Sequence, residues 1–202
     1  LNENPNEPTA VATGVLFTSA LRNAVKTTSN ESFLLGNNIA QLTAKTLRAE
    51  VDFYKWNAFP TLWEGLYESL TDLNQVILIA EETGNDQAKG AAMVSRAWVF
   101  SVLTQAYGDI PYSEAIDGAN ANFTPVYDAQ EDIIKDVVSQ LEQAAVLLGG
   151  SGSIPGDLIY DGDAMGWQKF ANSLQLRLLL RAGYAWPAAS GKFASVASSG
   201  KL

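Results

Sequence analysis

The chain has 202 residues, of which 47% are hydrophobic and 17% are charged, so it is long enough to bury one substantial core. Its formal net charge of −9 would repel a nucleic-acid backbone, and we therefore expect no nucleic-acid partner. The sequence contains no cysteine and no histidine, which excludes thiol nucleophiles, Ser-His-Asp relays and the usual zinc sites.

The first residues, LNENPNEPTAV, form a polar segment rich in Asn and Pro. Such a segment is typical of the region that follows a processed leader. Further along the chain there is no uninterrupted apolar stretch of about 18 residues, so we expect no membrane-spanning helix.

Helical periodicity dominates the chain, and strand-like alternation is almost lacking. Short connections such as NAFP, ETGND and GDIP bring successive helices into antiparallel contact. The sequence therefore predicts an all-α fold of antiparallel helical hairpins, similar in logic to tetratricopeptide repeats, with no sheet larger than two short strands. We expect residues 1–202 to form a single helical domain. The predicted helices span residues 9–27, 34–54, 61–83, 86–107, 125–148 and 163–184.

Local signals mark several of the predicted helix ends. Thr124 before Pro125 marks the start of the helix over 125–148 as its expected N-cap, and the glycine-rich GGSGS at 149–153 ends the same helix. The helix over 86–107 ends in the corner GDIPY at 108–112. We expect Gly108 to take a left-handed conformation there, and Pro111 prevents the helix from resuming. By itself the corner needs no chemistry beyond ending a helix.

The acidic residues do not predict a catalytic or metal site. Neighbouring carboxylates on a helix point to different faces, so we interpret the close pairs as solvated surface: Glu81 with Glu82, Glu131 with Asp132, and Asp161 with Asp163. The loop DLIYDGDAMG at 157–166 resembles a calcium loop but lacks the alternating ligands and the closing Glu. We expect no metal, no cofactor and no catalytic residue, and Asp163 can instead cap the next helix.

The order of motifs resembles a known family. SRAWVFSVLTQAYGDIPYSEA at 95–115 is similar to the Arg-Ala helix and Tyr-Gly-Asp-Ile-Pro corner of the SusD/RagB-like outer-membrane lipoproteins of Bacteroidetes. LWEGLYESLTDLNQVI at 62–77, PVYDAQEDIIKDVVSQLEQAAVLL at 125–148 and WQKFANSLQLRLLLRAG at 167–183 follow in the family's order. The resemblance covers nearly the whole chain.

The resemblance implies a binding protein and not an enzyme. It implies a surface-exposed outer-membrane lipoprotein that captures an oligosaccharide and hands it to a SusC-like TonB-dependent transporter, which the helical scaffold contacts. It also implies that this chain is the N-terminal part of a longer protein, whose N-terminal lipid anchor is not present here. On the helical hairpins alone, a scaffold that binds peptides or protein partners is the alternative.

A glycan-binding site is expected in VDFYKWNAFP, residues 51–60. Sugars pack their apolar faces on aromatic rings and need amide or carboxylate partners for their hydroxyls. We therefore predict that Tyr54, Trp56 and Asn57 contact glycan, although aromatic clusters of this kind also anchor helix junctions in protein cores. Trp63, Tyr67 and Trp98 have helical spacing and are expected to pack in the core.

Overall fold

The structure is a computed structural model that describes residues 13–47, 50–53, 55, 60–116 and 122–202. In chain order its elements are α1 (Thr13–Glu31), the π-helix η1 (Ser32–Gly36), α2 (Asn37–Ile39), α3 (Pro60–Glu82), α4 (Asp86–Tyr107), β1 (Ile110–Pro111), β2 (Tyr127–Asp128), α5 (Gln130–Leu147), α6 (Ala164–Ala182) and α7 (Ala189–Ala197). The strands β1 and β2 form a two-stranded antiparallel sheet. The all-α architecture predicted from the sequence is confirmed.

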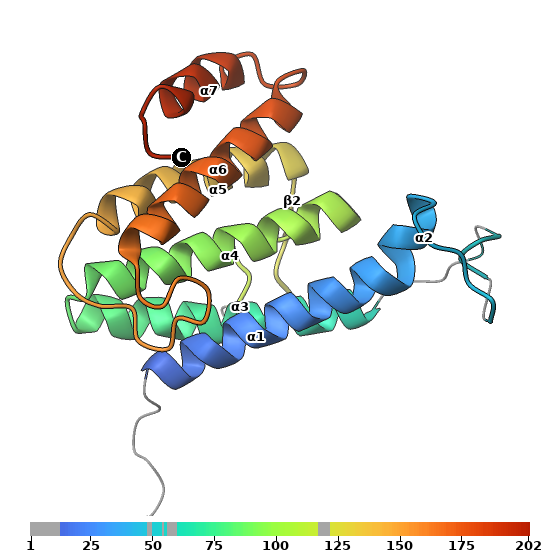
Figure 1. Ribbon diagram of the computed structural model, residues 1–202, viewed down its shortest axis with the longest axis horizontal. Coiled ribbons are helices and arrows are strands. Elements are labelled where there is room, and N and C mark those ends of the chain that lie inside the picture. Colours follow the sequence, from blue (N-terminus) through green and yellow to red (C-terminus); the bar gives the residue numbers. More distant parts are fainter. Residues whose placement is uncertain (1–12, 48–49, 54, 56–59, 117–121) are drawn as a thin grey trace, which may run out of the picture.

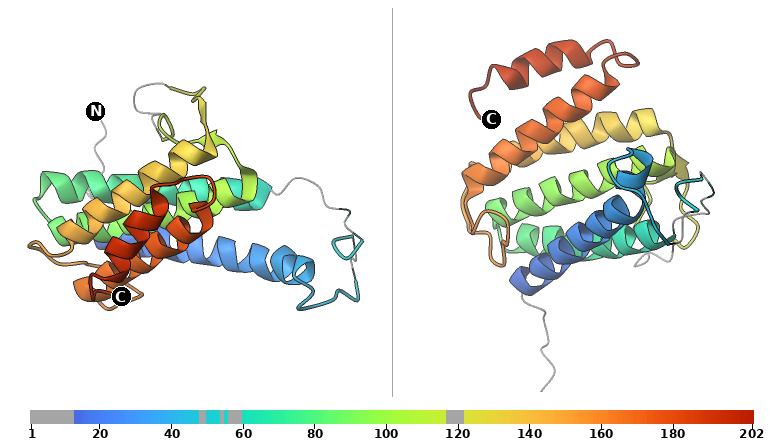
Figure 2. Two further views of the ribbon diagram at one scale, coloured as in Figure 1. Left: turned by 90° about the horizontal axis from the view of Figure 1, so that it is seen from above. Right: turned by 45° about the vertical axis from the view of Figure 1, so that its right-hand side comes forward.

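The long helices form an ordered stack of neighbours. Helix α1 packs on α3, α3 on α4, α4 on α5, α5 on α6, and α6 on α7. Figures 1 and 2 show this succession from the blue N-terminal helix to the red C-terminal one. The connection is short between α3 and α4 (residues 83–85) and between α6 and α7 (residues 183–188). Residues 108–129 separate α4 from α5, so the short connection predicted at GDIP is wrong.

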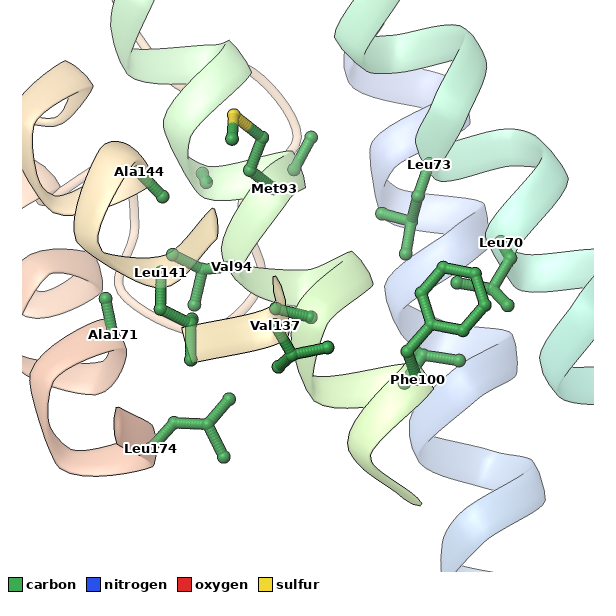
Figure 3. Close-up of a cluster of buried hydrophobic side chains, with 14 of the residues drawn as sticks. Leu70, Leu73, Met93, Val94, Phe100, Val137, Leu141, Ala144, Ala171 and Leu174 are labelled. Carbon is green, nitrogen blue, oxygen red and sulfur yellow. The ribbon is translucent and has the colours of Figure 1, made fainter. Parts of the chain in front are cut away.

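Helix α4 lies at the centre of the stack and is buried on most of its surface. It contacts α3 on one side and α5 on the other, with further contacts to α1 and α6. Figure 3 shows Phe100 of α4 directed toward Leu70 and Leu73 of α3, while Val137 and Leu141 of α5 lie on the other side. Because a helix buried on several faces needs apolar residues around most of its circumference, α4 has only a weak polar stripe.

The small residues of α4 allow close helix packing. A Cβ atom built on Gly90 would lie 2.9 Å from Cγ of Leu148 and 3.1 Å from the carbonyl oxygen of Ala144. Helix α5 therefore approaches α4 at the only residue type that leaves enough space.

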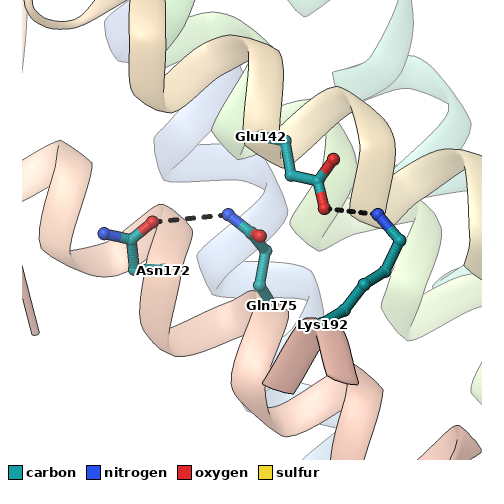
Figure 4. Close-up of polar contacts among 4 residues, drawn as sticks. All are labelled: Glu142, Asn172, Gln175 and Lys192. Carbon is teal, nitrogen blue, oxygen red and sulfur yellow. Dashed lines mark hydrogen bonds and ion pairs between the residues drawn. The ribbon is translucent and has the colours of Figure 1, made fainter. Parts of the chain in front are cut away.

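Polar contacts fasten the last helices to the stack. Nζ of Lys192 on α7 lies 2.7 Å from Oε1 of Glu142 on α5 (Figure 4). Nδ2 of Asn172 on α6 donates to the carbonyl oxygen of Lys201 over 2.8 Å, beyond the end of α7. Gln175 is buried beside them and donates to Oδ1 of Asn172 over 3.4 Å.

The predicted helix over 34–54 is wrong. Helical structure ends at Ile39, and the described residues of 40–53 form turns, bends or irregular chain. Leu42 and Leu47 are 75% and 82% exposed, so these two apolar residues are not covered by another element of the described part of the chain. A short helix without such packing is marginal in water.

The predicted start of the fifth helix is also wrong. Helix α5 begins at Gln130, after β2 has paired with β1, and not at Pro125. The helix is capped from a distance, because Oδ1 of Asp109 accepts the backbone N–H of Gln130 over 2.9 Å. Pairing across the corner overrides the local Thr-Pro signal.

The predicted bounds of the helix over 86–107 are confirmed. Asn85 caps its start by accepting the backbone N–H of Ala88 over 3.1 Å, and the backbone N–H of Gly108 donates to Thr104 at its end. Gly108 has φ 80° and ψ −122°, so its φ is positive as expected, but its ψ lies outside the left-handed helical region. The helices of the described part all lack the combined length and apolarity needed to cross a membrane.

Candidate functional site at the corner after helix α4

The corner at residues 108–113 is held rigidly by an aspartate from β2. Oδ2 of Asp128 accepts the backbone N–H groups of Tyr112 and Ser113 over 3.1 and 2.8 Å, and Oδ1 accepts the hydroxyl of Ser113 over 2.8 Å. Desolvation alone would raise the pKa of the Asp128 carboxyl, but the hydrogen bonds from Ser113 and Tyr112 together hold this pKa below its ordinary value. From the other side, the hydroxyl of Tyr67 on α3 donates to the carbonyl oxygen of Pro111 over 2.7 Å.

A pocket of about 500 Å³ lies between this corner and helices α3, α4 and α5. We call it the corner pocket. Its polar lining consists of amides, carboxylates, two hydroxyls and one guanidinium, and aromatic rings complete its walls: Asn74, Arg96, Phe100, Tyr112, Ser113, Ala115, Ile116, Asp128, Asp132, Ile133, Asp136 and Gln140.

Arg96 is the charged centre of a hydrogen-bond network in the corner pocket. Its Nη1 donates to Oδ1 of Asn74 over 3.0 Å, and its Nη2 donates to Oε1 of Gln140 over 2.9 Å. Its Nε is buried and has no acceptor within the described part of the chain. Burial lowers the pKa of the Arg96 guanidinium, while the nearby Tyr112 and Asp136 act in the opposite direction.

Tyr112 links this hydrogen-bond network to a carboxylate, that of Asp136, which balances the charge of Arg96. Its hydroxyl donates to Oδ2 of Asp136 over 2.5 Å and accepts from Nε2 of Gln140 over 2.7 Å. Nε2 of Gln140 also donates to Asp136 over 2.7 Å. Burial first and the hydrogen bond to Asp136 second raise the pKa of the Tyr112 phenol, so it remains a neutral donor.

This arrangement is suited to the recognition of hydroxyl groups. The corner pocket offers both acceptors and donors beside the ring of Phe100, which meets Tyr112 edge-on with centroids 4.6 Å apart. Sugars need this mixture of aromatic surface and hydrogen-bonding rim. In the described residues no group of three or more acidic side chains could hold a metal ion.

An aromatic cluster lies on the other side of the corner. Trp63, in the first turn of α3, meets Tyr107 edge-on with centroids 5.1 Å apart and lies nearly parallel to Tyr127 at 6.4 Å. Tyr127 is 65% exposed, so the cluster presents an aromatic face to solvent. We call Trp63, Tyr107 and Tyr127 the aromatic platform.

The expected core positions are confirmed with one refinement. Trp63, Tyr67 and Trp98 all pack against the hydrophobic core, but each is only partly buried. Burial raises the pKa of the Tyr67 phenol, whose hydroxyl is directed to the corner.

The predicted glycan contacts Tyr54, Trp56 and Asn57 lie outside the described residues and stay predictions. Along the chain they precede Pro60, the first residue of α3, and so come shortly before Trp63 of the aromatic platform. Sequence reasoning missed Arg96 and Tyr127. A signal for Arg96 was available, since a single cation in the middle of an otherwise apolar helix requires buried partners.

In the acidic loop at 157–166, the carboxylate of Asp157 accepts hydrogen bonds from the protein itself. Asp157 accepts the backbone N–H groups of Ile159 and Gly162 over 2.8 and 2.9 Å and the indole N–H of Trp167 over 2.7 Å. These donors occupy the carboxylate oxygens that a cation would need. Asp163 caps α6 by accepting the backbone N–H of Met165 over 2.9 Å, as predicted.

The acidic pairs interpreted as solvated surface have exposed side chains throughout. Glu81 forms an ion pair with Lys89, and Glu131 forms one with Lys135.

The stack of helical hairpins defines a tetratricopeptide-like scaffold. A family model described as "Starch-binding associating with outer membrane" matches residues 5–200. The chain therefore belongs to the SusD-like family, as the resemblance of its motifs predicted.

Solved structures agree with this assignment. A SusD homologue from Bacteroides fragilis is 26% identical with a TM-score of 0.76, and the match covers 94% of this chain and 41% of that one. A structure named a chitin-binding protein is 28% identical with a TM-score of 0.73, covering 90% of this chain and 41% of that one. A SusD homologue from Parabacteroides distasonis is 22% identical and shows the same fold, with a TM-score of 0.80 and coverage of 95% and 39%. The chain thus spans about two fifths of these structures. No curated protein sequence matches it.

Proposed function

We propose that this protein is a glycan-binding lipoprotein of the outer-membrane surface that captures an oligosaccharide and passes it to a SusC-like TonB-dependent transporter. The observation that carries the proposal is the match of residues 5–200 to a family of starch-binding proteins associated with the outer membrane. The likeness to a chitin-binding protein adds support for a carbohydrate ligand. The protein binds its ligand without chemical change.

The proposed glycan contacts are Tyr54, Trp56 and Asn57. Support comes from their residue types and from their position in the chain just before Trp63, whose platform already exposes the ring of Tyr127. Aromatic rings would pack on the sugar faces, and the amide of Asn57 would bond to hydroxyls.

Calorimetric titration with maltoheptaose and chitohexaose tests the site. We expect Trp56→Ala to weaken binding of the glycan that the protein accepts by at least about tenfold, as loss of a central aromatic contact does in other interfaces. Tyr184→Ala is the matched control, because Tyr184 is also an aromatic residue and is fully exposed after α6. Equal binding by wild type and Trp56→Ala would remove Trp56 from the site, and failure of both glycans would direct the search to other sugars.

The hand-off to a transporter needs a separate experiment. Outer membranes of the native cells would be solubilised in detergent, the protein purified by a C-terminal tag, and the associated proteins identified by mass spectrometry. We expect a TonB-dependent transporter in stoichiometric amount. Recovery of the protein from the cytoplasm, or from the membrane without a transporter, would contradict the hand-off.

A further inference from the structure

A second pocket, of about 350 Å³, lies where the last turns of α4 and α6 meet the first turns of α5. We call it the α6 pocket. Its lining has an apolar floor and a polar rim: Gln105, Gln130, Glu131, Ile134, Lys135, Leu178, Arg181, Ala182, Ala185 and Trp186. Its volume is in the range of small-ligand sites.

The α6 pocket is separate from the corner pocket. Helix α5 contributes residues 130, 131, 134 and 135 to the α6 pocket but residues 132, 133, 136 and 140 to the corner pocket. These two sets lie on different faces of the helix. A ligand in one pocket would therefore leave the other free.

Hydrogen bonds to backbone carbonyl groups hold two of the residues that line the α6 pocket. The side chain of Gln130 donates to the carbonyl oxygen of Thr104 and ties the start of α5 to the end of α4. The backbone N–H of Trp186 donates to the carbonyl oxygen of Ala182 over 2.8 Å, which holds the indole in the turn after α6. Trp186 is partly buried against the hydrophobic core and lines the pocket with its remaining surface.

The rim of the α6 pocket carries positive charge that the described residues do not neutralise. Glu131 is paired with Lys135 at 2.6 Å, and the guanidinium of Arg181 forms no ion pair or hydrogen bond within the described part of the chain. Arg177 lies one turn before Arg181. Burial first and the positive charge of Arg181 second lower the pKa of Arg177. Like charges at this spacing repel, so the proximity of Arg177 and Arg181 costs stability.

Gln105 adds an unused hydrogen-bond donor. Its Nε2 is buried and has no acceptor within the described residues. A buried donor without a partner costs about 1–3 kcal/mol, and a ligand oxygen would remove that cost.

We propose that the α6 pocket binds a carboxylate-bearing saccharide, such as a uronic acid unit of an acidic glycan. The guanidinium of Arg181 would hold the carboxylate, because its planar donors match the geometry of that group. The indole of Trp186 would pack on the sugar face, and the rim amides would take hydroxyls. This site is additional to the glycan site proposed near α3. Either site can be confirmed or refuted without the other.

NMR titration of the ¹⁵N-labelled protein with digalacturonate tests the proposal, with digalactose as the neutral match. We expect saturable shifts of the Trp186 indole N–H with digalacturonate and at least about tenfold weaker binding of digalactose. Arg181→Gln should weaken digalacturonate binding by at least about tenfold. Arg177→Gln is the matched control, since Arg177 does not line the pocket, and it should change the affinity by less than about twofold.

Several outcomes would overturn the proposal. They are no Trp186 shift at up to about 10 mM digalacturonate, equal binding of the neutral disaccharide, or an equal loss in both arginine variants. Because Arg181 is exposed, its replacement should leave the fold intact, and equal melting temperatures of the two variants would verify this.

Discussion

At the scale of single residues, Tyr112 connects the corner to the helices beneath it. Its hydroxyl is shared between Asp136 and Gln140, and Gln140 in turn accepts from Arg96. The neutral side chains of Gln140 and Tyr112 thus connect the guanidinium of Arg96 to the carboxylate of Asp136. Removing one link leaves a partly buried charge with fewer partners, which is costly in a protein interior.

We predict that Tyr112→Phe lowers the free energy of unfolding by about 1–2 kcal/mol, because the carboxylate of Asp136 loses its phenolic donor. The control is Tyr127→Phe. The Tyr127 hydroxyl makes no hydrogen bond among the described residues, and its side chain is largely exposed, so this change should be neutral. Urea unfolding followed by circular dichroism measures both. Similar losses in the free energy of unfolding in the two variants would contradict a stabilising role of the Tyr112 hydroxyl.

Asp128 gives the corner a pH dependence. Its pKa is held below the ordinary value by hydrogen bonds from Ser113 and Tyr112, so the unfolded state takes up this proton first as the pH falls. The stabilising contribution of Asp128 is present above about pH 4 and is lost below it. Asp128→Asn should therefore be less stable than wild type at neutral pH, with a difference that narrows between about pH 5 and pH 3. Thermal melts across this range would show the narrowing, and a constant difference would contradict it.

At the scale of elements, a helix predicted from the sequence is present in the structure where it packs against other helices. Helix α4 was predictable to the residue because Asn85 and Gly108 mark its ends and apolar residues fill its length. The predicted helix over 34–54 had a similar apolar spacing, but Leu42 and Leu47 are exposed and no helix among the described residues covers them. Periodicity reports the tendency to form a helix, while tertiary contacts decide whether the helix forms. The start of α5 could not be predicted because its cap, Asp109, lies 21 positions away.

Gly90 tests the close approach of α4 and α5. We predict that Gly90→Ala lowers the free energy of unfolding by about 1–3 kcal/mol, because the new methyl group would overlap Leu148 and approach the carbonyl oxygen of Ala144. The matched control is Gly191→Ala in α7, where nothing lies within 4 Å of the added atom. That change should stabilise by about 0.5–1 kcal/mol through helix propensity alone. Chemical unfolding of both variants would decide, and a gain in stability at residue 90 would contradict the predicted overlap.

At the scale of the whole molecule, the stack of hairpins provides a rigid support for surfaces at its ends and corners. The all-α fold could be predicted from the sequence, since helical periodicity covers most of the chain and strand-like alternation is almost lacking. The corner pocket could not, because Arg96, Tyr112 and Asp136 come from three separate elements and no local pattern shows that they meet. The predicted aromatic site at Tyr54, Trp56 and Asn57 lies outside the described residues and remains a prediction.

Whether the protein captures glycan can be decided with a glycan array. The labelled wild-type protein and Trp56→Ala would be applied to the same array, with a peptide array as the comparison for a protein-binding scaffold. We predict that wild type binds a restricted set of related oligosaccharides, that Trp56→Ala loses this binding, and that the peptides are not bound. Binding to peptides with no signal on any glycan would contradict the account.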